Sequence, residues 1–411
     1  MTIRLALSDM YRKNRDDLRA LFLWEYPSFF YRGSRGIERG EIPVFVFHSV
    51  LPDRFESQIG YLAANGYRTL DADGLLDIII GRKPAQENTV VLTFDDGRGS
   101  LWATAYPILR KYGMKAIAFI VPSRIREIED KGLNLDDVWE RRTEPSVVLE
   151  RDSKEPFLTW NEIREMHRSG MIDIQSHTTW HSSVYVSGRI VEFANPSFDI
   201  SFLKGSLNPV VRRGGRDVVP GRVDWGSPIY EWGAAVGSER RYIEDEELTR
   251  ILTDHVKENG GKTFFDGTGW RKSLRRLARD FERRNGKKGR FQTLEERKAD
   301  IYKDLLQSKK KIEEEIGKHV THLCYPWYRG CEMAVQASRE AGYTCNHWGL
   351  FARRTVNRVG GDPYHVARVI DDYIFLLPGK RRRSLFEVLA ARGRGIAAQR
   401  AGKNTLVRGT S

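Results

Sequence analysis

The chain of 411 residues has few cysteines and no long apolar run. Its three cysteines are Cys324, Cys331 and Cys345, and no Cys-x-x-Cys pair is present, so neither a disulfide scaffold nor a cysteine-based metal site is expected. No segment approaches the roughly 20 apolar residues of a membrane-spanning helix. Residues 1–19 are too charged to contain the apolar core of a signal peptide. We therefore expect a cytoplasmic protein with reduced thiols.

Positive charge is in excess, with a formal net charge of +13 at pH 7. Solvated helix faces are the simplest interpretation, and the alternative is contact with a membrane surface, through an anionic lipid, or with a phosphorylated sugar carrier. No helix-turn-helix, zinc-finger or aromatic RNA-binding pattern accompanies the charge, so no specific nucleic-acid partner is expected. The basic stretches are residues 271–288, 380–383 and 392–408.

Two adjacent carboxylates follow a strand-like segment. Residues 89–92 are apolar and β-branched, and they lead into Thr93-Phe94-Asp95-Asp96-Gly97. Adjacent side chains in an extended chain point to opposite sides. Asp95 and Asp96 can therefore do different work, one as a metal ligand and the other as a general base toward water. The alternative is a turn without a catalytic role, since Asp and Gly favour turns.

Two histidines follow a second apolar segment. Residues 171–174 predict a strand, which leads into Ser176-His177-Thr178-Thr179-Trp180-His181. On a helical turn, the spacing of four places both imidazoles on one face, about 5–6 Å apart at Cβ. Two neutral imidazoles so placed can bind one zinc-like ion. The alternative is a pair of polar surface histidines on a loop.

Together, and in this order, the two motifs resemble those of the polysaccharide deacetylases, also called the NodB-homology or carbohydrate esterase family 4 proteins. The family motifs Thr-Phe-Asp-Asp-Gly and Ser-His-Thr-x-x-His are both present letter for letter. The resemblance covers residues 41–181 and 320–390. Outside the two motifs it rests on Pro43–Val50, Phe55–Thr69, Leu158–Trp160, Cys324–Trp327, Ala341–Tyr343 and Ala367–Val369.

This resemblance implies an activity and a set of site residues. The family removes N-acetyl groups, or other small acyl groups, from sugars with the help of zinc or a similar divalent ion. By resemblance, Asp95 is the general base. The implied metal ligands are Asp96, His177 and His181, and the candidate substrate-binding residues are Tyr325, Trp327, Arg368 and His48.

Two features of the family are missing from this chain. Cys324 stands where the third motif usually carries an arginine that orients the base, and Arg368 and Arg329 are candidate substitutes. No copy of the late Leu-x-x-His stretch that often supplies the general acid is present. His365 and His347 are the available candidates, although His365 is typical of a loop and His347 of a partly buried position. Another proton donor or a degenerate site remains an alternative.

The predicted elements indicate an α/β fold, because short apolar strands alternate with helices from Pro43 onward. We expect a distorted (β/α) barrel of the NodB-homology type with a large, mostly helical insertion, and a site at the carboxyl ends of the strands. The expected parts are a leader at 1–40 with a helix over 18–30, the barrel at 41–181 and 320–390, the insertion at 182–319, and a basic tail at 391–411. Within the insertion, residues 182–237 predict loops and short strands, and helices follow at about 244–258, 269–285 and 293–316.

These observations favour a metal-dependent hydrolase that removes an N-acetyl, or similar short acyl, group from a sugar. Because no export signal is found, a nucleotide-linked or lipid-linked sugar is expected rather than an extracellular polymer. Two alternatives stay open, a hydrolase of a non-sugar amide on the same scaffold and a catalytically degenerate protein that binds a glycan or a partner. The sequence specifies neither the sugar nor the oligomeric state.

Overall fold

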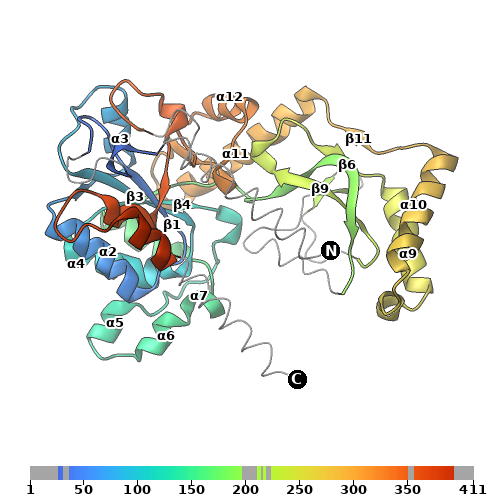
Figure 1. Cartoon of the computed structure of the whole chain (residues 1–411), viewed down its shortest axis with the longest axis horizontal. Helices are drawn as coiled ribbons and strands as arrows, with labels where there is room; N and C mark the ends of the chain where they lie inside the picture. Colours follow the sequence, from blue (N-terminus) through green and yellow to red (C-terminus); the bar gives the residue numbers. More distant parts are fainter. Residues whose placement is uncertain are drawn as a thin grey trace. The chain divides into compact units, whose positions relative to one another are not determined.

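The computed structural model (Figure 1) describes residues 26–30, 37–196, 211–213, 216–218, 224–349 and 356–392. Its contacts divide the chain into two compact units. The barrel unit comprises the described residues of 26–176, 311–323 and 344–392. The insertion unit comprises those of 177–310 and 324–343. This division groups residues 177–181 with the insertion, whereas the sequence analysis assigned them to the barrel.

One sheet forms the centre of the barrel unit, in the strand order β13-β12-β5-β4-β3-β1-β14, with β2 beside β3. The ladders from β14 through β1, β3, β4 and β5 to β12 are parallel. A parallel bridge joins His347 of β13 to Val366, just before β14, so the strand order returns on itself. The expected distorted (β/α) barrel is therefore confirmed. The strands are β1 Val44–Phe47, β2 Arg68–Thr69, β3 Thr89–Asp96, β4 Ala116–Ile120, β5 Ile172–Ser176, β12 His322–Cys324, β13 Cys345–His347 and β14 Val369–Ile370.

Helices connect these strands and cover the sheet, as expected for repeated βα units. Every residue of β1, β3 and β4 is buried. Strands of a parallel sheet that is covered on both faces are buried in this way, and their sequences are therefore nearly continuous apolar runs. The helical segment that follows β3 begins with a π-helical turn, Leu101–Ala105, before α4. The helices are α2 Pro52–Ala64, α3 Ala72–Ile79, α4 Tyr106–Tyr112, α5 Leu135–Trp139, α6 Pro145–Leu149, α7 Arg151–Lys154 and α8 Trp160–Arg168.

The insertion unit combines antiparallel ladders with helices. The predicted helices of the insertion are confirmed as α9 Glu246–Glu258, α10 Trp270–Asn285 and α11 Leu294–Ile316. The expectation of short strands is wrong for β6 (Ser183–Phe193), which pairs with β9 (Pro228–Ala234) near both of its ends. Its alternation is interrupted at Gly188, where the register shifts, so the sequence pattern hides one long strand. The remaining elements are β7 Val211–Arg213, β8 Arg216–Val218, β10 Tyr242–Ile243, β11 Arg290–Phe291 and α12 Glu332–Glu340.

The predicted leader helix over 18–30 lies mostly outside the described residues. Its last residues, Ser28–Phe30, form a 3₁₀ turn, η1, and Phe29 and Phe30 are buried. The last described residue is 392, so nearly all of the predicted basic tail at 391–411 lies outside the described residues. Among the helices that the structure describes, none is both long and apolar enough to cross a bilayer.

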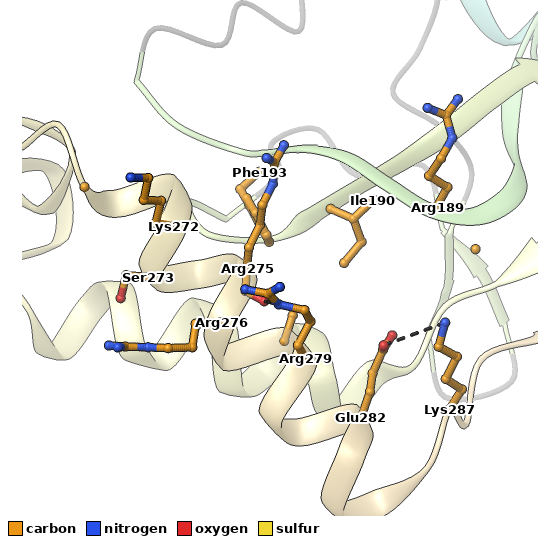
Figure 2. Close-up of a pocket in the computed structure, with 13 residues that line it drawn as sticks. Arg189, Ile190, Phe193, Lys272, Ser273, Arg275, Arg276, Arg279, Glu282 and Lys287 are labelled. Carbon is orange, nitrogen blue, oxygen red and sulfur yellow. Dashed lines mark hydrogen bonds and ion pairs between the residues drawn. The ribbon is translucent and has the colours of Figure 1, made fainter.

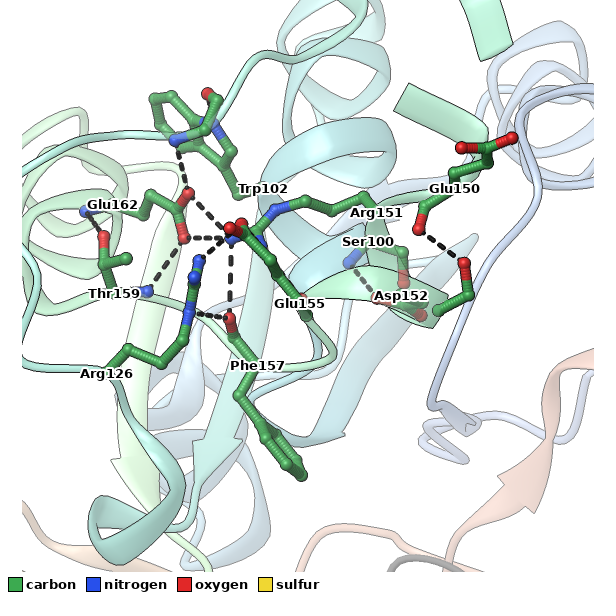
Figure 3. A network of polar contacts seen from close by, with 12 residues as sticks. Ser100, Trp102, Arg126, Glu150, Arg151, Asp152, Glu155, Phe157, Thr159 and Glu162 are labelled. Atoms are coloured by element: carbon green, nitrogen blue, oxygen red, sulfur yellow. Dashed lines mark hydrogen bonds and ion pairs between the residues drawn. The ribbon is translucent and has the colours of Figure 1, made fainter. Parts of the chain in front are cut away.

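A buried ion pair joins α7 to α8 in the barrel unit (Figure 3). Arg151 Nη2 lies 3.0 Å from Glu162 Oε1, and both side chains are buried. Glu162 also accepts hydrogen bonds from the backbone N–H groups of Gly132 and Thr159. The contact with Thr159 completes a capping box at the start of α8.

The same region holds the loop that follows the first motif. The N–H of Gly99 donates to Pro156 O at 2.9 Å, and the N–H of Leu158 donates to Gly97 O at 3.0 Å. The N–H of Ser100 donates to Asp152 Oδ1 at 2.7 Å. Residues 151–159 therefore fix the path of the chain directly after Asp95 and Asp96.

We predict that Arg151→Leu lowers the free energy of unfolding by about 3–5 kcal/mol, because Glu162 is left buried without its cation. Urea denaturation measures this loss. The control is Lys154→Ala, which removes an exposed partner of Glu150 and should cost under about 1 kcal/mol. Equal losses in the two variants would contradict the structural importance of the buried pair.

Candidate active site

Both motifs leave the sheet at the same edge. Asp96, the last residue of β3, is in register with Ile120 of β4, and Ile120 is in register with Ser176 of β5. His177 follows Ser176 directly in the chain, so the second motif starts two strands away from the end of the first. The expectation that both motifs lie at carboxyl ends of strands is confirmed.

Asp95 is held by a two-point ion pair with Arg368. Arg368 Nη1 lies 2.7 Å from Asp95 Oδ1, and Nη2 lies 2.8 Å from Oδ2. Arg368 also donates from Nε to Trp348 O and from Nη1 to Thr93 Oγ1. Such a bidentate pair fixes the plane of the carboxylate. Arg368 therefore orients the candidate base in a chain whose third motif has Cys324 instead of arginine.

The prediction that Arg368 binds substrate is corrected by this arrangement. Its side chain is 0% exposed and that of Asp95 is 2% exposed. All three guanidinium nitrogens donate to protein acceptors, so the guanidinium group is occupied within the barrel unit. The sequence analysis named Arg368 as a candidate substitute for the missing arginine, and its contact with Asp95 is consistent with that expectation.

Asp96 adopts a left-handed backbone conformation, which residues other than glycine rarely adopt. Its φ is 73°, and Gly97 follows at 70°, so two left-handed residues turn the chain out of β3. A Cβ on Gly97 would lie 2.9 Å from Ile125 Cδ1. Two cations flank the carboxylate, because Arg124 Nη1 and Arg98 Nη2 each lie 3.4 Å from one of its oxygens. Burial lowers the pKa of Arg124 to about 10, which leaves Arg124 charged at neutral pH.

His177 and His181 lie on a loop and not on the helical turn considered in the sequence analysis. Positive φ values at Thr178 (66°) and His181 (47°) bend this loop, and the two imidazole centroids lie 4.9 Å apart. Strained residues of this kind concentrate at functional sites. The bent loop brings the imidazoles of His177 and His181 together, as the spacing of four would do on a helical turn.

The tautomer of His177 follows from its hydrogen bond. Its Nδ1 lies 2.8 Å from Cys324 O, and a carbonyl oxygen can only accept, so Nδ1 carries the proton. The lone pair is then on Nε2, which is the arrangement found in metal-binding histidines. Cys324 thus orients His177 through its backbone carbonyl oxygen, and its side chain takes no part in this contact.

Asp304 of α11 anchors the histidine loop, and the sequence analysis did not single it out. Thr179 donates to Asp304 twice, from its N–H to Oδ1 at 3.0 Å and from Oγ1 to the backbone O at 2.6 Å. Burial raises the pKa of Asp304 to about 6, although the hydrogen bonds from Thr179 oppose the shift. No local pattern distinguishes this aspartate from the other polar residues of α11.

The remaining substrate-binding candidates differ in accessibility. Trp327 is half-buried, and its ring centroid lies 4.5 Å from that of His181. His48 is exposed and directly follows β1, whose last residue, Phe47, is in register with Phe94 of β3. Tyr325 is fully buried, so the expectation that its side chain lines a substrate pocket is not supported by its position.

The two candidates for the general acid also differ. His347 is fully buried, and burial lowers its pKa well below the usual range, so it is neutral and unavailable as a solvent-facing acid. His365 is partly exposed, with Nδ1 2.6 Å from Asp362 Oδ2, and its ring stacks on Trp348. The geometry therefore favours His365.

Comparison with known proteins gives a family match over part of the chain. Residues 82–195, which include both motifs, match the family model described as polysaccharide deacetylase. Residues 82–195 are thus similar to the polysaccharide deacetylases. The resemblance to NodB-homology proteins inferred from the motifs is therefore confirmed.

Several relatives carry the name poly-beta-1,6-N-acetyl-D-glucosamine N-deacetylase. The protein of Escherichia coli (strain K12) is 32% identical over 136 residues, which are 33% of this chain and 18% of that protein. The protein of Staphylococcus aureus (strain MSSA476) is 26% identical over 133 residues, or 32% of this chain and 37% of that protein. The matches thus span less than half the length of these relatives. A de-N-acetylase structure from Aggregatibacter actinomycetemcomitans covers 80% of this chain and 94% of its own at 19% identity, with a TM-score of 0.46.

We predict that Asp95 and Arg368 are energetically coupled. A double-mutant cycle of Asp95→Asn and Arg368→Met, measured by urea denaturation, should give a coupling energy of about 1–3 kcal/mol, because each single variant leaves a buried polar partner unpaired. The control cycle combines Asp95→Asn with Arg82→Met, which removes an exposed arginine paired with Asp77. Additivity of both cycles would mean that the buried pair does not hold the base.

We also predict a pH-dependent effect of Asp304→Asn. A carboxyl group whose pKa is raised in the folded state binds its proton more tightly than in the unfolded chain, so folding loses stability as pH rises from about 4 to about 6. The asparagine side chain keeps a hydrogen-bond acceptor but does not titrate. The variant should therefore gain about 1–3 kcal/mol relative to wild type across this window. Unfolding measured at pH 4, 5, 6 and 7 tests this, and a pH-independent difference would contradict it.

Proposed function

We propose that this protein is a metal-dependent hydrolase that removes an N-acetyl, or similar short acyl, group from a sugar. The observation that carries the proposal is the bidentate Asp95–Arg368 pair. A chain that had lost catalysis would have no need to hold the candidate base from a second position after losing the usual arginine. The match of residues 82–195 to the deacetylase family supports the same conclusion.

The proposed metal ligands are Asp96, His177 and His181. One carboxylate and two imidazoles form a donor set that suits zinc and leaves a coordination position open. The tautomer of His177 inferred from its hydrogen bond to Cys324 O, with the lone pair on Nε2, fits this role. When bound, the ion would lower the pKa of a water molecule and polarise the acyl carbonyl.

The protein side chains then have separate tasks. Asp95 would accept the proton of the attacking water, with both carboxylate oxygens kept in place by Arg368. His365, oriented by Asp362, would deliver a proton to the leaving amine. The half-exposed ring of Trp327 would offer an apolar face to the sugar.

A basic groove in the insertion unit supports an anionic group in the substrate. The groove encloses about 850 Å³ between β6 and α10 (Figure 2). Within the described part of the chain, Arg275, Arg276 and Lys272 of α10 form no ion pair with a carboxylate. Arg189 of β6 also lines the groove but is paired with Glu231. Such a surface attracts phosphate. We propose a cytoplasmic, nucleotide-linked or lipid-linked sugar as the substrate.

We predict that the purified chain binds a divalent ion and releases acetate from N-acetylated sugars. His177→Ala/His181→Ala should lose both properties at this site. Asp95→Asn should keep the ion and lose about 10²–10⁴-fold in kcat, because only the proton acceptor is removed. Acetate release from a panel of neutral oligosaccharides, phosphate-linked sugars and non-sugar amides, together with mass spectrometry of bound metal, makes the measurement.

The outcomes separate the rival functions. Turnover of the non-sugar amides alone would reject the sugar specificity, and metal binding without any turnover would favour a binding protein. The variant Arg275→Ala/Arg276→Ala should weaken activity on phosphate-linked sugars and leave activity on neutral oligosaccharides unchanged. Equal activity of wild type on both substrate classes would reject the anionic carrier.

A further inference from the structure

A second set of metal-binding side chains lies inside the barrel unit, on β12 and β13. His322 is the first residue of β12, and Cys345 and His347 are the first and last residues of β13. Because alternate residues of a strand point to the same face, Cys345 and His347 share one face of β13. All three side chains are 0% exposed.

The distances between the donor atoms suit a single ion. His322 Nδ1 lies 3.3 Å from His347 Nε2, and Cys345 Sγ lies 3.6 Å from the same nitrogen. One donor atom from each residue lies within 4.8 Å of both others. Tetrahedral zinc with bonds of about 2.0–2.1 Å to nitrogen and about 2.3 Å to sulfur separates two nitrogens by about 3.3 Å, and nitrogen from sulfur by about 3.6 Å. Both observed distances agree with these values.

Hydrogen bonding alone explains this cluster poorly. The 3.3 Å between the two imidazole nitrogens exceeds the usual range of about 2.7–3.2 Å for an N–H donor. A bond between the rings would use one lone pair, whereas an ion would use a lone pair from each of the three donors. The far nitrogen of His322, Nε2, has no hydrogen-bond partner within the described part of the chain, and Asp73 Oδ1 lies 3.7 Å away, beyond hydrogen-bond distance. Phe119 packs against His347 with 4.7 Å between ring centroids.

We propose that His322, Cys345 and His347 bind a soft metal ion, zinc in the first instance, at a buried site separate from the proposed catalytic metal. The sulfur donor favours Zn(II) or Cu(I) over hard cations such as magnesium. The site shares no residue with Asp96, His177 and His181. Its burial indicates a structural ion, and binding releases the proton of the Cys345 thiol to solvent.

The test uses the full chain carrying His177→Ala/His181→Ala, so that the imidazoles of the catalytic site are absent. After chelation, cobalt(II) is added as a spectroscopic substitute for zinc. We expect one equivalent of cobalt and a thiolate-to-cobalt charge-transfer band in the near ultraviolet. Adding Cys345→Ser should abolish the band, whereas adding Cys331→Ser, at a half-buried thiol outside the cluster, should leave it unchanged.

A second variant keeps the proposal falsifiable if Cys345→Ser does not fold. Asp73→Ala removes a mostly exposed carboxylate near His322, and it should weaken zinc affinity up to about 10-fold, because the nearby negative charge favours the bound cation. Circular dichroism of each metal-free variant confirms the fold. The proposal is overturned if the parent chain shows no thiolate band, or if the band depends on Cys331 and not on Cys345.

Discussion

The ion pair between Asp95 and Arg368 is the constraint on which the rest of the site depends. It connects residues that are 273 positions apart, at the end of β3 and just before β14, with β1 between the two strands. A buried carboxylate is costly unless it is paired, and here both of its oxygens are paired. The pair therefore joins β3 to the segment before β14 and orients the candidate base. A substitution that weakens the pair should affect stability and chemistry together.

Around this pair, the chain supports a strained backbone with buried polar contacts. Asp96, Thr178, His181 and Trp327 all have positive φ, although none is glycine. Such conformations cost free energy and persist only where the surroundings determine them. For the first motif, residues 151–159 provide this support through hydrogen bonds to the loop after Asp96. For the second motif, Asp304 provides it through Thr179.

The sequence predicted the elements that depend on residues close together in the chain. The strand before Asp95 and the helices of the insertion follow from residue patterns within a few turns of chain. The partner of Asp95 could only be named as one of two arginines, because its choice depends on how distant strands pair. Asp304 carries no local signal, and Gly188 interrupts the alternation that would have marked β6 as one strand. The family motifs identified the site, but not the contacts that hold it in place.

The cluster of His322, Cys345 and His347 shows the same limit. The sequence analysis excluded a cysteine-based metal site because no Cys-x-x-Cys spacing is present, yet neighbouring strands can supply donors that no spacing rule detects. β12 and β13 have three residues each, so the backbone hydrogen bonds between these strands are few. At His347 the strand order returns toward β14 through the bridge to Val366. An ion bound there would join two short strands where the barrel closes, which is where a cross-link contributes most to a sheet with short ladders.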